Sequence, residues 1–376
     1  MAYARQLLRI APDRLSFGAV HPVGVYGRLG RKPILDFLDH TESRWESVGQ
    51  TGPLARRHDA LTTLLALRPQ PVPALRNSTP RVLVQASPHH LTRPTLMASI
   101  LRRERARFVC LVHDLIPLEY PEYARPDGAA QHRRRIETIV AQADGIIANS
   151  HATLASLDPW LRRAGATPHV TVAHLGTHDI PASAVAHTRA RAEERPYFVS
   201  IGTIEPRKNH LLLLNLWRRM AEEASAANIP KLVLIGRRGW ENEQIVDMLE
   251  RCPALVGCVE ERSGLSDRET RAVLSGARAL LMPSFAEGYG MPVTEALDLG
   301  VPVLCSDLPA LREAGGAVPL FLDPLDGPAW RRAIMAYADP DDRERQVQLA
   351  RLAAWRRPTW KDHIARVEKL IEAVAR

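Results

Sequence analysis

Glu287 and Glu295 lie eight positions apart in one segment, PSFAEGYGMPVTEALDLG, at Pro283–Gly300. Carboxylates accept hydrogen bonds well from hydroxyl groups and are poor ligands for phosphate. Gly288 and Gly290 stand between them, so backbone N–H groups would be exposed just before a helix. Such N–H groups, together with the helix dipole, favour an anion such as phosphate. The pattern predicts a nucleotide-sugar pocket, and the alternative is a helix-capping glutamate in a tight loop.

A strand and a helix are needed to position this loop. We expect a strand at Ala279–Met282 and a helix at Pro292–Leu299. Proline suits the first turn of a helix, and Gly300 suits its end. The phosphate would therefore bind where the strand gives way to the helix.

A second segment, SIGTIEPRKNH at Ser200–His210, carries adjacent cations. A strand is expected to end at Ile201, with Arg207 and Lys208 just beyond it and Asn209 capping the next helix. Arginine offers a fork of donors and lysine a point charge, and together they suit a diphosphate. A solvated basic turn is the alternative interpretation.

Two further segments are candidates for the opposite wall of the site. In VHDLIPLEYPEY, His113 follows an apolar strand and could hydrogen-bond a transferred sugar or balance phosphate charge. In PVGVYGR, Gly24 could let the backbone approach a donor phosphate. A structural histidine and an ordinary loop are the alternatives.

Length and charge limit the classes of protein to consider. The chain has 376 residues, which suits two domains. Residues 1–190 carry 24 Lys and Arg against 15 Asp and Glu, whereas the remaining residues carry 26 against 27. The basic first half suggests an anionic partner such as a nucleic acid, a membrane surface or a phosphate-bearing acceptor; an Arg-rich proteome would also explain it.

Neither a membrane-spanning run nor a signal-peptide core is evident, so we expect a cytoplasmic protein.

Short apolar runs alternate with helical patterns, which predicts parallel sheets covered by helices. The expected strands in the first half are Arg81–Gln85, Phe108–His113, Gly145–Ala148 and Val170–Ala173. In the second half they are Tyr197–Ile201, Lys231–Ile235, Leu255–Val259, Ala279–Met282 and Val301–Cys305. Ligands in such sheets bind at the carboxyl ends of the strands.

The expected organisation is two α/β domains facing a central cleft. Residues 1–178 form the acceptor-side domain, 179–196 a linker, and 197–359 the nucleotide-sugar domain. An amphipathic helix at 360–376 could pack back on the first domain. The first 20 residues do not form a clear strand pattern.

Four segments of the chain resemble motifs of a known family. FAEGYGMPVTEAL resembles the EX7E signature of retaining glycosyltransferases of family 4, which have the GT-B fold of two Rossmann-like domains. GTIEPRKNH, VHDLIPLEYPEY and IGRRGW are similar to other motifs of the bacterial branch that contains O-antigen and exopolysaccharide mannosyltransferases.

The resemblance implies a role for each matching residue. Arg207 and Lys208 would hold the diphosphate and stabilise the leaving group, Glu287 would contact sugar hydroxyls, and Glu295 the ribose. His113 would lie beside the donor sugar. The other donor-binding residues implied are Gly24, Gly202, Thr203, Gly288, Tyr289, Gly290 and Met291. No DxD metal motif is evident, so the implied chemistry needs neither metal nor cofactor.

The resemblance therefore implies a retaining hexosyltransferase that moves mannose from GDP-mannose to a growing, lipid-linked glycan in bacterial surface polysaccharide or lipopolysaccharide synthesis. Base contacts are expected from Val259–Leu265, and peripheral contact with the inner membrane face is expected from the basic first half. Rhamnose, fucose or glucose-type sugars on GDP, dTDP or UDP are alternatives. Alternatives to a transferase are a GT-B epimerase, a nucleic-acid binder and a nicotinamide dehydrogenase. The dehydrogenase would need a GxGxxG motif directly after a strand, and no convincing case is present.

Overall fold

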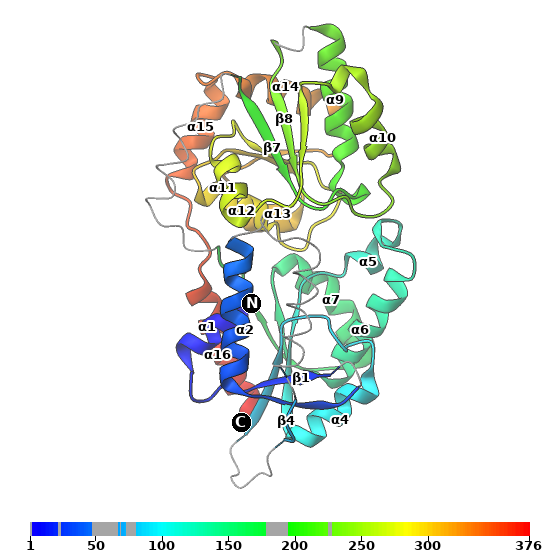
Figure 1. The fold of residues 1–376 in the computed structure, drawn as a ribbon, viewed down its shortest axis with the longest axis vertical. Helices are drawn as coiled ribbons and strands as arrows, with labels where there is room; N and C mark the ends of the chain where they lie inside the picture. The colour runs from blue at the N-terminus through cyan, green and yellow to red at the C-terminus, as the bar shows by residue number, and fades with distance from the viewer. Residues whose placement is uncertain are drawn as a thin grey trace.

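The computed structural model of the chain describes residues 2–21, 24–46, 67, 69–72, 80–177, 195–224 and 228–376. Its main feature is a pair of separate parallel sheets, one in each half of the chain (Figure 1). The linker expected at 179–196 lies outside the described residues except for Arg195 and Pro196.

The first sheet has four strands in the order β3-β4-β5-β6. Their bounds are Arg81–Gln85, Ala106–Val112, Gly145–Ala148 and His169–Val172. The elements around them are α4 (Pro94–Glu104), α5 (Ile116–Glu119), η1 (Pro121–Tyr123), α6 (Gly128–Gln142) and α7 (His151–Ala164). Buried apolar side chains of α4, α6 and α7 pack on one face of this sheet. The predicted strands are confirmed to within two residues at each end.

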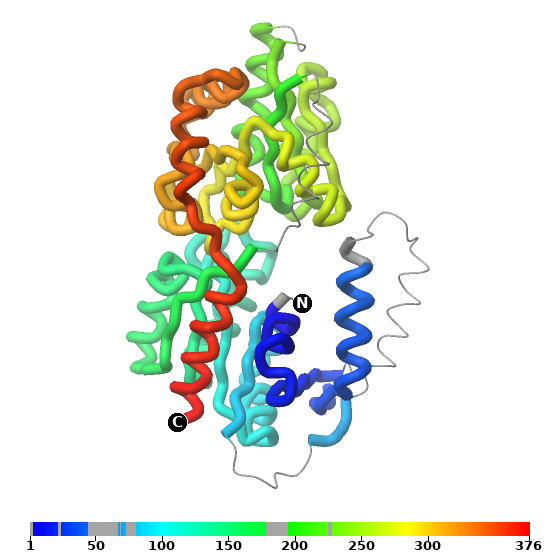
Figure 2. The backbone as a smooth tube through the Cα atoms, turned by 90° about the vertical axis from the view of Figure 1, so that its left-hand side faces the viewer, coloured from blue at the N-terminus to red at the C-terminus, as the bar shows by residue number. Residues whose placement is uncertain are grey.

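The opposite face of the first sheet is covered by both ends of the chain. Helices α1 (Ala2–Ile10) and α16 (Trp360–Ala375) pack there, with Ile364, Val367 and Leu370 in one core cluster with Tyr3. Figure 2 shows the chain leaving the upper half and running down to α16 beside the lower half.

The described part of the first 46 residues contains two helices and a hairpin. After α1, strands β1 (Phe17–Val20) and β2 (Tyr26–Leu29) pair antiparallel, and α2 (Arg31–Glu46) follows. The hairpin is tied to α4 by the buried Glu104, which accepts hydrogen bonds from Tyr26 (2.9 Å) and Arg28 (2.6 Å). Strands of only four residues, each containing a glycine, are too short to give a clear alternating pattern in the sequence.

The second sheet has six strands in the order β12-β11-β10-β7-β8-β9. Their bounds are β7 Tyr197–Ile201, β8 Lys231–Ile235, β9 Val259–Arg262, β10 Leu280–Met282, β11 Val303–Ser306 and β12 Leu320–Leu322. The surrounding elements are η2 (Pro206–Lys208), α9 (His210–Glu223), α10 (Glu243–Arg251), η4 (Pro253–Leu255), α11 (Asp267–Ser275), α12 (Met291–Asp298), α13 (Pro309–Gly315), α14 (Gly327–Ala338) and α15 (Arg343–Leu352). Two apolar clusters pack on its faces.

One predicted strand was wrong. The segment Leu255–Val259 is not a strand: a 3-10 turn ends at Leu255, Gly257 has φ +77°, and β9 begins at Val259. β9 lies at the edge of the sheet and its residues are mostly charged, so a search for apolar runs finds the preceding turn instead. Among the described residues, no helix combines the length and apolar character needed to cross a membrane.

Candidate functional site

Two loops meet at the carboxyl ends of neighbouring strands β7 and β10. The main-chain N–H of Phe285 donates to the carbonyl of Arg207 (2.9 Å). The Arg207 guanidinium donates in turn to the carbonyl of Ala286 (2.6 Å). Because these bonds join the loop after β7 to the loop after β10, they bring Glu287 to the adjacent cations.

Arg207, Lys208 and Glu287 form a buried charge cluster. Lys208 Nζ lies 2.6 Å from Glu287 Oε1, and Arg207 Nη1 lies 3.1 Å from Glu287 Oε2. Glu205, which the sequence analysis overlooked, is 2.6 Å from the other arm of Arg207. Only 8% of the Glu287 side chain and 12% of the Lys208 side chain are exposed. Two positive and two negative charges balance, as burial requires.

The protonation of the cluster follows from its contacts. Burial alone would raise the pKa of Glu287, but the charges of Lys208 and Arg207 outweigh it and the net pKa is lowered. Behind the pair, burial and the Lys208 charge lower the pKa of His210 to about 4, so this imidazole is neutral. At neutral pH Glu287 is therefore ionised and His210 is neutral.

The glycines around the cluster permit close backbone packing. Gly202 has φ +150°, and a Cβ there would lie 3.2 Å from the Lys208 side chain. Gly290 has φ +105° and precedes Met291, the first residue of α12. Proline at the second helical position leaves the helix start well formed. The turn that begins α12 therefore follows Glu287 directly in the chain.

The structure brings His113 to this loop through its main chain. A Cβ on Gly288 would lie 2.4 Å from the carbonyl of His113, so only glycine fits where the two halves meet. The His113 ring is exposed and contacts the carbonyl of Ala86 (3.2 Å). The Tyr289 ring is buried and stacks on His174 at 5.1 Å.

Three residues that the sequence pointed to are not members of the charge cluster. Asn209 stands at the N-cap position of α9, but its side chain donates to Pro324 (3.0 Å) and does not cap the helix, because Asn209 has the left-handed φ of +55°. Thr203 packs against Gly239. Gly24 lies in the β1–β2 turn with φ +87°, and among the described residues no hydrogen bond joins it to the cluster.

Glu295 lies in the second turn of α12, one turn beyond the predicted phosphate position. Burial raises the pKa of its carboxyl to about 7. Within the part of the chain that the structure describes, no hydrogen bond or ion pair reaches this carboxylate. A buried acid with a strongly shifted pKa and no hydrogen-bond partner is a candidate for ligand binding.

Replacing Glu295 with Gln is expected to raise the melting temperature by a few degrees at pH 8, with a gain that shrinks as the pH falls to 5. The folded-state pKa of about 7 lies above the ordinary value of 4.5. The folded protein therefore binds the proton of Glu295 more tightly than the unfolded chain does. The free energy of unfolding falls as the pH rises from 4.5 to about 7, because ionisation is then favoured only in the unfolded chain. Thermal unfolding of both proteins at the two pH values measures this; an equal shift at both would contradict it.

A cavity of about 470 Å³ lies at the carboxyl ends of β8 and β9. It is lined by Arg237, Arg238, Glu261 and Ser263. Two of these residues belong to the segment Val259–Leu265 in which base contacts were predicted. The described residues contain no grouping of three or more His, Cys, Asp or Glu side chains that could hold a metal ion.

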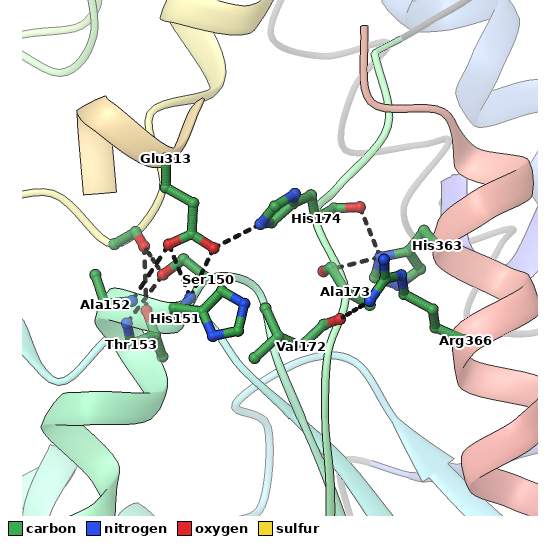
Figure 3. Close-up of polar contacts among 11 residues, drawn as sticks. Ser150, His151, Ala152, Thr153, Val172, Ala173, His174, Glu313, His363 and Arg366 are labelled. Atoms are coloured by element: carbon green, nitrogen blue, oxygen red, sulfur yellow. Dashed lines mark hydrogen bonds and ion pairs between the residues drawn. The ribbon is translucent and has the colours of Figure 1, made fainter. Parts of the chain in front are cut away.

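Contacts across the two halves were not foreseen. Glu313 of α13 reaches the start of α7 and His174, and Ser150 and Thr153 of the first half reach the carbonyl of Gly288 (Figure 3). No sequence signal pairs these residues, because their meeting depends on how the halves are placed.

Solved structures similar to this one share its fold. Sucrose-phosphate synthase from Thermosynechococcus elongatus has a TM-score of 0.58 at 19% identity, covering 78% of this chain and 73% of that one. Anabaena HepE in complex with UDP-glucose has a TM-score of 0.58 at 15% identity, covering 86% and 84%. These likenesses establish the GT-B fold.

The chain is similar to curated mannosyltransferases, among them two of Escherichia coli. O-antigen chain mannosyltransferase B is 35% identical over 167 residues, which are 44% of this chain and 43% of the relative. The serotype-specific mannosyltransferase WbdA is 27% identical over 226 residues, 56% of this chain and 27% of the relative. The chain thus spans less than half the length of these relatives.

A family model described as "Family 4 Glycosyltransferase in conflict systems" matches residues 96–375. That range contains both sheets, the Arg207–Lys208–Glu287 cluster and Glu295. The chain therefore belongs to glycosyltransferase family 4.

Proposed function

We propose that the protein is a retaining hexosyltransferase that transfers mannose from GDP-mannose to a growing glycan in bacterial surface polysaccharide synthesis. The observation that carries the proposal is the buried Arg207–Lys208–Glu287 cluster beside the N-terminus of α12. The mannosyltransferase names of the relatives support the choice of sugar. The name of the first of them, an O-antigen chain mannosyltransferase, supports the acceptor class.

The proposed division of labour follows the two sheets. Residues 1–178, with the helix at 360–376, form the acceptor-side domain; 179–196 is the linker; and 197–359 is the donor domain. Contacts of α16 with β3, β4, β5 and β6 support its assignment to the first domain. Gly24 is proposed to approach the donor phosphate from the β1–β2 turn.

In the donor domain, Arg207, Lys208 and the N–H groups of Gly288–Met291 receive the diphosphate. The charge that develops on the leaving phosphate is stabilised by these preorganised groups, usually the largest catalytic contribution. Since Lys208 is paired with Glu287, the arriving phosphate draws Lys208 toward itself and the sugar hydroxyls take its place on Glu287. Glu295 accepts from the ribose, and the cavity at β9 receives the base.

Retention would follow from attack on the same face that the leaving group departs from, with the leaving phosphate oxygen taking the acceptor proton. Glu287 and Glu295 would not be the acid and nucleophile of a glycosidase, because Glu287 is held by two cations. His113 would lie beside the transferred sugar.

We also propose a peripheral contact with an anionic membrane, which the excess of basic residues in the first half supports. On the first half, Arg133 and Arg163 lie 5.3 and 5.9 Å from the centre of the Trp160 ring. Arginine over an aromatic ring suits an interface that is anionic outside and apolar beneath. Co-sedimentation with anionic vesicles that disappears at high salt would support this contact, and salt-independent pelleting would oppose it.

A thermal-shift panel of nucleotide sugars tests the donor. Ligands that bind only the folded protein raise its melting temperature by mass action. We expect GDP-mannose to give the largest shift, with UDP-glucose and dTDP-rhamnose near the ligand-free value. A larger shift with a UDP or dTDP donor would mean that the donor base is uracil or thymine and not guanine. No shift with any donor would contradict the proposed function.

A further inference from the structure

The carboxylate of Glu313 caps a helix that belongs to the other half of the molecule (Figure 3). Glu313 lies on α13, and its oxygens accept from the N–H of His151 (2.8 Å) and of Ala152 (3.3 Å) at the start of α7. The same carboxylate contacts Nε2 of His174 at 2.6 Å. A negative charge at a helix N-terminus is stabilising, and bonds to an ionised acceptor are the stronger kind.

The environment keeps Glu313 ionised. Burial alone would raise its pKa, but the hydrogen bonds from His174 and from the N–H of His151 outweigh this and the net pKa is lowered. The main chain of His174 is held in turn by α16, because the carbonyl of His174 contacts Nδ1 of His363 at 3.0 Å. Figure 3 shows the line of contacts from α13 through His174 to α16.

The same end of α7 also holds the donor loop. The hydroxyl of Ser150 donates to the carbonyl of Gly288 (2.6 Å), and the hydroxyl of Thr153 lies 3.1 Å from the carbonyls of both Gly288 and His113. Gly288 directly follows Glu287. The start of α7 is therefore attached to the second half at two points, α13 and the donor loop.

We propose that Glu313 is a positioning residue, which holds the two halves in the arrangement where α7 fixes Gly288, and through it Glu287, against His113. The inference has two parts. The contact between the halves stands on the hydrogen bonds alone, whereas its effect on catalysis rests on the proposed function.

Hydrogen exchange at the start of α7 measures the first part. The first N–H groups of a helix have no partner inside the helix, and those of His151 and Ala152 bond to Glu313. In Glu313→Ala we expect these two amides to exchange about tenfold faster or more, as loss of a charge-assisted bond implies. In Glu313→Gln, which keeps a neutral acceptor oxygen, the exchange rates should lie between those of the unsubstituted protein and those of Glu313→Ala.

Glu269→Ala is the matched control. Glu269 accepts from the N–H of Ser266 (2.7 Å) in a capping box of α11, entirely within the second half. Its loss should speed exchange at Ser266 and leave His151 unchanged. Unchanged exchange at His151 and Ala152 in Glu313→Ala would overturn the contact, whether or not the protein transfers any sugar.

Steady-state kinetics test the second part. In folded Glu313→Ala we expect kcat/KM for donor to fall about tenfold, with partial recovery in Glu313→Gln and no change in Glu269→Ala. Faster exchange with unchanged kinetics would overturn the positioning role. Absence of transfer in the unsubstituted protein would oppose the proposed function and leave the exchange result standing.

Discussion

Lys208→Ala is expected to abolish sugar transfer, lowering kcat by about a hundredfold to a thousandfold. Removing one preorganised donor from a developing negative charge typically has an effect of this size. Lys208 is the buried ammonium that meets the leaving phosphate in our proposal, and its Nζ is held 2.6 Å from Glu287. Release of nucleoside diphosphate from GDP-mannose in the presence of acceptor gives the rate.

The design must separate lost chemistry from lost folding. Removing one member of a buried ion pair can cost about 3–5 kcal/mol, because the partner is left unpaired. The double variant Lys208→Met with Glu287→Gln removes both charges together and should fold while remaining inactive. Lys361→Ala changes an exposed lysine on α16 and should be fully active. Near-normal transfer by folded Lys208→Ala would refute the leaving-group role.

Glu287→Gln is expected to reduce transfer by about a hundredfold while binding GDP at least as tightly as the unsubstituted protein. Glu287 is ionised and contacts both Lys208 and Arg207, and Glu205 also contacts Arg207. A glutamine amide at position 287 would free Lys208 for the diphosphate but accept sugar hydroxyls more weakly, since bonds to ionised acceptors are about twice as strong.

Calorimetric titration with GDP and with GDP-mannose distinguishes the two effects. We expect Glu287→Gln to retain its affinity for GDP. The increase in affinity from GDP to GDP-mannose should be smaller than in the unsubstituted protein. Glu287→Ala would expose the uncompensated cations and should also lose stability, so Gln is the informative change. Wild-type transfer by folded Glu287→Gln would mean that this acid does not contact the sugar.

Sequence pattern was sufficient to locate the cluster because its members follow two apolar strands. Arg207 and Lys208 come after β7, and Glu287 after β10. Adjacent parallel strands end at the same edge of a sheet, so the residues had to meet once these strands paired. Which charge pairs with which could not be predicted, since the partners depend on the 2.9 Å bond between Phe285 and Arg207 that joins the loops.

Other features lacked a local signal. The edge strand β9 is mostly charged and was misplaced onto the preceding turn, and the β1–β2 hairpin has strands of only four residues, most of them half-buried. The contacts of Glu313 with α7 join residues more than 160 positions apart, and nothing in either segment specifies the other. The raised pKa of Glu295 likewise comes from burial, which exists only in the folded protein.

The central claim, retaining transfer of mannose from a nucleotide donor at this site, is tested most directly by NMR of the transfer reaction. GDP-α-mannose and a synthetic oligomannoside acceptor are incubated with the protein, and the anomeric signal of the new linkage is followed together with released GDP. We predict an α-linked product and one GDP for each bond formed, both lost in the Lys208→Met, Glu287→Gln double variant. A β-linked product, or a double variant that still transfers, would contradict the account.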